Sequence, residues 1–132
     1  MKKIVFLFFI LMVSYGCAAT NVNELRIKGK HYVYYTSGSL QNVYNRAIKR
    51  CNECGIYISN EYIDNSANEA GISLIYRNDS TQQFYWIAHS DIKEETENKI
   101  KIDVYGINTM DRIVKFIAVM RYVAENKDGC PQ

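Results

Sequence analysis

Two cysteines three positions apart, Cys51 and Cys54, are the side chains best suited by type and spacing to carry out chemistry. In redox enzymes of the thioredoxin type, such a Cys-x-x-Cys pair opens a helix, where the positive end of the helix dipole lowers the thiol pKa. Here the pair closes a predicted helix just before Gly55. The negative end of the dipole should raise the thiol pKa, so this position argues against redox catalysis.

The same cysteines could instead bind a metal or form a disulfide. A zinc site would need a fourth ligand beside Cys51, Cys54 and Cys130, and only the isolated His31 and His89 are available. We therefore expect no metal and no cofactor. For disulfides, three possibilities stay open: Cys51 or Cys54 pairs with Cys130, Cys51 pairs with Cys54, or the thiols stay free or link two molecules.

No sequence pattern identifies a catalytic nucleophile. The chain has no Gly-x-Ser-x-Gly turn, no glycine-rich phosphate loop and no His-Glu-x-x-His. His89 and Asp91 could form a dyad only across a bend, so we expect a surface histidine. Glu94, Glu95 and Glu97 are expected at a solvated hairpin tip. These residues favour a non-enzymatic protein.

The first residues have the layout of an export signal. Lys2 and Lys3 precede the apolar run 4–13, and small residues follow it. The run is shorter than the roughly 20 apolar residues that a membrane-spanning helix needs. Gly16 followed by Cys17 resembles the lipobox of bacterial lipoproteins, in which signal peptidase II cuts before the cysteine.

This resemblance implies that residues 1–16 are a signal peptide and that Cys17 carries acyl chains such as palmitate. Ala18 behind the cysteine implies the outer membrane, if the cell has one. The protein would then be anchored in the bacterial cell envelope, facing the periplasm. The alternatives are secretion without lipid, after a cut behind Ala19, and an uncleaved anchor.

Charge limits the partners of the mature chain. Once Lys2 and Lys3 are removed, 14 basic residues remain against 14 acidic ones. Nucleic acid is therefore not an expected partner, and membrane contact would come from the N-terminal lipid. We expect a tether over residues 17–30 and a single domain over residues 31–132.

Apolar periodicity and turn residues predict the elements of this domain. The predicted strands are 31–36, 56–60, 72–77, 84–89 and 99–105, and the predicted helices run from 40 to Gly55 and from Asn108 or Thr109 to 125. Residues 91–98 are expected to be a charged, projecting hairpin end. The order β-α-β-β-β-β-α predicts an α+β fold, with two helices on one face of a mostly antiparallel sheet.

Aromatic residues suggest a binding surface. Alternation along a strand places Phe84 and Trp86 on one face and Tyr85 on the other. We expect the uncovered sheet face to gather five aromatic residues: Tyr32, Tyr34, Tyr57, Trp86 and Tyr105. The alternatives are that these residues cover the back of a thin sheet or are buried in a dimer.

Together these observations predict a small non-enzymatic envelope lipoprotein that binds, or is an accessory component of, an envelope protein assembly. One alternative is an inhibitor or immunity-type lipoprotein that uses the charged residues 91–98 as its probe. Another is a periplasmic thiol oxidoreductase using Cys51 and Cys54.

Overall fold

The structure, a computed structural model, describes residues 19–107 and 110–132 and confirms an α+β fold. Cys17, the leader and the proposed helix caps Asn108 and Thr109 lie outside the described residues. The described elements, in chain order, are α2 (Val22–Lys28), β1 (Lys30–Ser37), α3 (Leu40–Glu53), β2 (Asn60–Asp64), β3 (Glu69–Asn78), β4 (Gln83–Thr96), β5 (Lys99–Gly106) and α4 (Asp111–Ala124).

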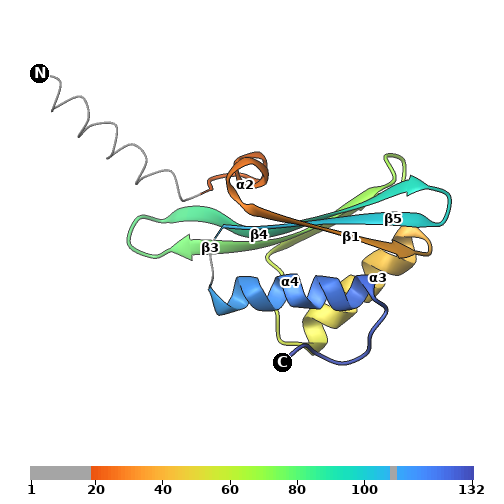
Figure 1. Ribbon diagram of the computed structural model, residues 1–132. Helices are drawn as coiled ribbons and strands as arrows, with labels where there is room; N and C mark the ends of the chain where they lie inside the picture. The colour runs from red at the N-terminus through yellow and green to blue at the C-terminus, as the bar shows by residue number, and fades with distance from the viewer. Residues whose placement is uncertain (1–18, 108–109) are drawn as a thin grey trace, which may run out of the picture.

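The strands form one sheet in the order β1-β5-β4-β3-β2, and every neighbouring pair is antiparallel. Strands β1 and β2, which are joined through α3, are therefore the two edges of the sheet. The connection from β1 to β2 crosses the whole width of the sheet, and the remaining strands fill the space between them through hairpins (Figure 1).

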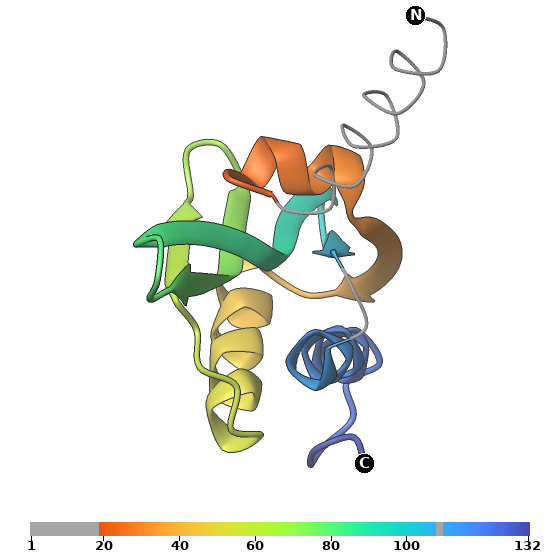
Figure 2. The same cartoon turned by 90° about the vertical axis from the view of Figure 1, so that its left-hand side faces the viewer.

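Helices α3 and α4 lie on one face of the sheet and enclose the core with it (Figure 2). Helix α3 begins at Ser39, whose side chain accepts a hydrogen bond from the backbone N–H of Asn42. Both helices bury an apolar stripe. The stripes consist of Leu40, Val43, Ala47 and Cys51 in α3, and Ile113, Phe116, Val119, Met120 and Val123 in α4.

Strand β5 shows the expected alternation of buried and more exposed side chains. In β5, Ile100, Ile102 and Val104 are buried in the core, while the residues between them are only half-buried on the other face.

Helix α2 lies on the other face, against β4 and β5, in residues where the sequence analysis expected only a tether (Figure 1). Asn21 caps it by accepting a hydrogen bond from the backbone N–H of Glu24. Leu25 is its one fully buried residue. A seven-residue helix with a single apolar anchor has no periodic stripe, so hydrophobic patterning does not reveal it.

Two strand predictions are wrong in their limits. The first is the strand predicted at 56–60: residues 56–59 instead connect α3 to β2. The apolar Ile56 and Ile58 that suggested a strand pack against the core from this connection. Strand β4 continues to Thr96, so the predicted hairpin end at 91–98 reduces to a turn at Glu97 and Asn98. The density of charged residues at 91–98 predicted a turn, but charged side chains also fit a strand wherever alternate positions face water.

Candidate functional site

The five aromatic residues of the predicted binding surface do not form one patch. Tyr32 and Tyr34 lie opposite core residues of β5 and therefore face the helices α3 and α4. Tyr105 and Trp86 face the opposite side, where α2 lies, and Tyr57 is in the connection after α3. Which face each side chain takes depends on the strand order and register, and these do not follow from alternation within single strands.

The prediction for the Phe84-Tyr85-Trp86 cluster is confirmed. Trp86 lies opposite Ile75 on the face of α2, whereas Tyr85 packs against the core beneath α3 and α4. Phe84 is on the same face as Trp86 and is 52% exposed.

Cys54 and Cys130 form a disulfide, one of the pairings that the sequence left open. Helix α4 ends at Ala124, and the tail behind it doubles back toward the end of α3 (Figure 1). The backbone N–H of Lys127 donates to the carbonyl of Tyr122, and Gly129 adopts a φ of 80°, which glycine tolerates best. This reversal brings the two cysteine Cα atoms within 5.5 Å of each other.

Cys51 is a free thiol at the centre of the core. Burial, and to a lesser degree the charge of Glu61, raise the pKa of Cys51 to about 12. A thiol with such a pKa is protonated at neutral pH and is a poor nucleophile.

A polar network beneath α2 includes the His-Asp pair that the sequence analysis placed on the surface. His89 Nδ1 lies 2.6 Å from Ser73 Oγ, and His89 Nε2 lies 2.8 Å from Asp91 Oδ1. Arg26 of α2 donates to both oxygens of Asp91, at 2.8 and 2.6 Å. The prediction of a surface histidine is wrong, because residues two apart on a strand share a face and no bend is needed.

The network has the residue types of a serine-histidine-aspartate triad, but it is closed to a substrate. Ser73 is 4% exposed and His89 is 2% exposed. Burial alone would raise the pKa of Asp91, but hydrogen bonds from His89 and Arg26 outweigh it and lower this pKa to about 2. The arrangement therefore fastens α2 to the sheet through a charged hydrogen-bond network.

Tyr62 covers the network from the side of β2. It lies over Gly71, where a Cβ atom would approach the Tyr62 ring to 2.3 Å. Glycine at this position lets the ring pack onto the sheet next to His89.

His31, the second histidine, lies on the face of α2. It is 2.6 Å from Asp103 and stacks on Tyr105, with ring centres 4.5 Å apart. Among residues 19–107 and 110–132, no group of three or more His, Cys, Asp or Glu side chains is placed to hold a metal ion.

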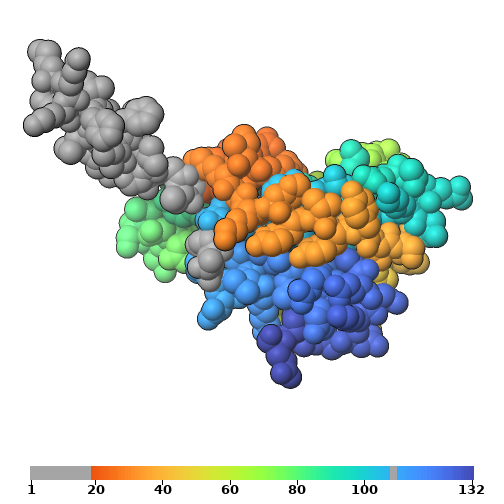
Figure 3. Space-filling model, in the orientation of Figure 1, coloured from red at the N-terminus to blue at the C-terminus, as the bar shows by residue number. Residues whose placement is uncertain are grey.

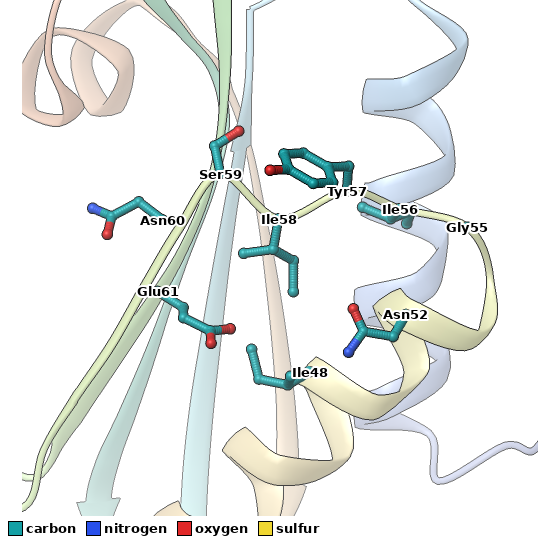
Figure 4. A pocket seen from close by; sticks show the side chains of 9 residues that line it. All are labelled: Ile48, Asn52, Gly55, Ile56, Tyr57, Ile58, Ser59, Asn60 and Glu61. Carbon is teal, nitrogen blue, oxygen red and sulfur yellow. The ribbon is translucent and has the colours of Figure 1, made fainter.

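An open groove lies between the C-terminal half of α3 and the beginning of β2 (Figure 4). Its volume is about 660 Å³. Ile48 and Ile58 point toward each other across it, Asn52 and Glu61 supply polar groups, and Tyr57 stands beside it with 78% of its surface exposed. A neighbouring hollow shares Ile48, Asn52 and Glu61 and extends the groove along α3.

The groove borders a free sheet edge. Strand β2 pairs only with β3, so the backbone groups on its other side are unpaired within the sheet. This site could not be predicted while residues 56–60 were expected to form a strand, because in the structure residues 56–59 form the connection that borders the groove. Of the groove residues, only Tyr57 belonged to the predicted binding surface.

No model of a known protein family matches this chain, and no curated protein sequence matches it either. In the part of the chain that the structure describes, no helix has both the length and the apolar character needed to cross a bilayer.

Proposed function

We propose that this protein is a small non-enzymatic lipoprotein of the bacterial cell envelope, anchored through acyl chains on Cys17, that binds another envelope protein. The observation that carries the proposal is the disulfide between Cys54 and Cys130. Disulfides persist in oxidising compartments outside the cytosol. The disulfide therefore accords with the basic and apolar leader, which implies export.

The cysteine arrangement favours this proposal over the thiol oxidoreductase alternative. An enzyme of that type cycles a disulfide between the two cysteines of its motif. Here Cys54 is joined to Cys130, which is 76 residues away, and Cys51 is buried with a raised pKa. Neither sulfur is placed to exchange disulfides with a substrate protein.

The groove and the edge of β2 are the proposed binding site. An extended segment of the partner would add a strand to the outer edge of β2, where its backbone finds unpaired hydrogen-bonding groups. An apolar side chain of that segment would enter the groove between Ile48 and Ile58. Tyr57, large and exposed, would supply the aromatic contact that often dominates such interfaces.

Site-specific crosslinking in intact cells tests this site. A photo-reactive amino acid replaces Tyr57 in one variant and Lys115, on the exposed side of α4, in a matched control. We expect one defined crosslinked product, containing an exported protein, from position 57 and none from position 115. Equal products from both positions, or none from 57, would contradict the proposed site.

The inhibitor or immunity-type alternative keeps one supporting observation. The acidic residues Glu94, Glu95 and Glu97 lie at the β4–β5 hairpin, which projects at one end of the molecule (Figure 3). Lys93 and Lys99 lie beside them, so the hairpin is a charged projection that could pair with complementary charges on an invading enzyme. A crosslink from position 97 and none from position 57 would favour this alternative.

A further inference from the structure

The described chain begins in direct contact with the sheet. The carbonyl of Ala19 accepts a hydrogen bond of 2.9 Å from the backbone N–H of Trp86, and the Ala19 side chain is fully buried. Thr20 then bonds to Glu24 through both its backbone N–H and its hydroxyl, which ties the entry to the first turn of α2. Residues 19–30 therefore pack against the sheet as part of the domain.

This entry point fixes where a lipid on Cys17 would be. Cys17 is two positions before Ala19, and two extended residues span at most about 7 Å. The inference rests on the proposed acylation of Cys17. If Cys17 is acylated, the bilayer lies next to the part of the domain that contacts Ala19, with no long tether between them.

That part of the domain is the end of the β3–β4 hairpin, where aromatic residues lie beside the polar turn 78–82. Trp86 and Phe84 line a shallow groove together with Thr20. Phe84 and Tyr76 are 52% and 45% exposed, and the guanidinium of Arg77 lies 5.7 Å from the centre of the Phe84 ring. Tryptophan and tyrosine gather at bilayer interfaces, and arginine can reach lipid phosphates from there.

The opposite end of the molecule lies far from this aromatic end and is densely charged. Strand β4 runs 14 residues from Gln83 to Thr96, which corresponds to about 45 Å in extended form. Its far end and the turn that follows carry charges of both signs: Glu94, Glu95 and Glu97, with Lys93 and Lys99 beside them. Figure 3 shows this β4–β5 hairpin, in cyan, projecting away from the green β3–β4 hairpin.

We propose that the β3–β4 hairpin end, with Trp86, Phe84, Tyr76 and Arg77, rests in the headgroup region of the bilayer that holds the acyl chains. The domain then stands end-on, with the charged β4–β5 hairpin pointing away from the membrane. The lipid surface is the occupant of this exposed aromatic end.

Trp86 reports directly on this contact because it is the single tryptophan of the chain. The acylated protein, purified from membranes in detergent, is reconstituted into vesicles of phosphatidylethanolamine and phosphatidylglycerol whose acyl chains carry bromine near the headgroup. We expect Trp86 fluorescence to fall relative to vesicles without bromine. A second measurement uses iodide, a quencher that stays in water. We expect iodide to quench Trp86 less when the acylated protein is bound to vesicles without bromine than when a lipase has removed its acyl chains and the protein is free in detergent-free solution.

A matched variant tests the orientation. Trp86→Phe combined with Glu97→Trp moves the tryptophan to the acidic turn, and we expect bromolipid to leave its fluorescence unchanged. If this double variant fails to fold, the iodide measurement on the natural chain still decides the contact. If iodide quenches Trp86 as strongly on vesicles as in solution, the proposal is overturned.

The outcomes separate this proposal from the proposed function. The end-on contact is refuted if the protein floats with the vesicles but bromolipid does not quench Trp86. It is also refuted if tryptophans at positions 86 and 97 are quenched equally. Neither result contradicts the lipid anchor. A protein without acyl mass that does not float refutes the lipoprotein itself, and the contact with it.

Discussion

Asp91 links α2 to the sheet through its side-chain hydrogen bonds. It receives two hydrogen bonds from Arg26, and it lies 2.8 Å from His89 Nε2. The pairing of His89 with Asp91 could have been predicted from strand alternation alone. The contributions of Ser73 and Arg26 could not, because they come from β3 and α2, and only the register of the sheet brings them near.

Replacing Asp91→Asn keeps the size of the side chain and removes its charge. We expect a loss of about 1–2 kcal/mol in the free energy of unfolding, since hydrogen bonds to charged groups contribute in that range and the Arg26 pair is partly exposed. Urea unfolding at pH 7 measures it. Asp79→Asn, in the exposed β3–β4 turn, is the control and should change stability by less than about 0.5 kcal/mol. Equal stability of the two variants would show that the network contributes nothing.

The same carboxylate predicts a pH dependence. The pKa of Asp91 is lowered from 3.8 to about 2 in the folded protein, so the folded state favours the charged form. This stabilisation is complete above the pKa of the unfolded chain and is lost as pH falls toward 2. The stability difference between the natural chain and Asp91→Asn should therefore shrink between pH 4 and pH 2. A difference that stays constant over this range would contradict the role of Asp91.

At the scale of elements, α2 shows what patterning cannot find. The helix is held by one buried leucine, a cap at Asn21 and the Arg26 pair, and none of these makes a periodic signal. The helices α3 and α4 could be predicted because each buries a stripe of four or five residues at helical spacing.

Leu25→Ala tests whether α2 belongs to the domain. Truncating a fully buried leucine leaves a cavity, so we expect a loss of about 2–4 kcal/mol in the free energy of unfolding. Ile27→Ala in the same helix is the control, since Ile27 is 83% exposed and should be nearly neutral. If residues 22–28 were only a tether, both variants would unfold at the urea concentration of the natural chain.

The C-terminal tail shows a second limit of sequence analysis. Antiparallel helices place Cys130 far from Cys54 unless the tail doubles back, and residues 126–132 have no apolar periodicity that would indicate this reversal. Only the local geometry around Lys127 and Gly129 creates it.

Cys54→Ser removes the crosslink between Cys54 and Cys130. A disulfide that closes a loop of 76 residues should stabilise the folded state by about 4 kcal/mol through the entropy of the unfolded chain. We expect the variant to unfold at lower urea concentration than the natural chain under oxidising conditions. With reductant present the two proteins should unfold together. If the two proteins are equally stable in the absence of reductant, the disulfide between Cys54 and Cys130 is ruled out.

The whole molecule combines predictable and unpredictable parts. The α+β class, the two core helices and the alternation in β5 follow from composition and periodicity. The order β1-β5-β4-β3-β2 depends on contacts between residues far apart in sequence, such as those of β1 with β5. Since that order decides which aromatic residues share a face, the predicted five-residue binding surface could not be assembled correctly from the sequence.

In the whole molecule, two different surfaces are proposed to do two different tasks. The aromatic β3–β4 end is proposed to meet the bilayer beside the acylated Cys17, and the groove beside β2 is proposed to receive a partner. Both assignments depend on export and lipid attachment, because they place the domain at a membrane in an oxidising compartment.

Export and lipid attachment can be tested together on the native protein, extracted with detergent from membranes of the cells that make it. Its intact mass is measured first, and its peptides are then mapped without reduction. We predict a chain that begins at Cys17 with added acyl mass and holds one disulfide, between Cys54 and Cys130, with Cys51 free. A chain that retains residues 1–16, has no acyl mass and carries only free thiols would contradict this prediction.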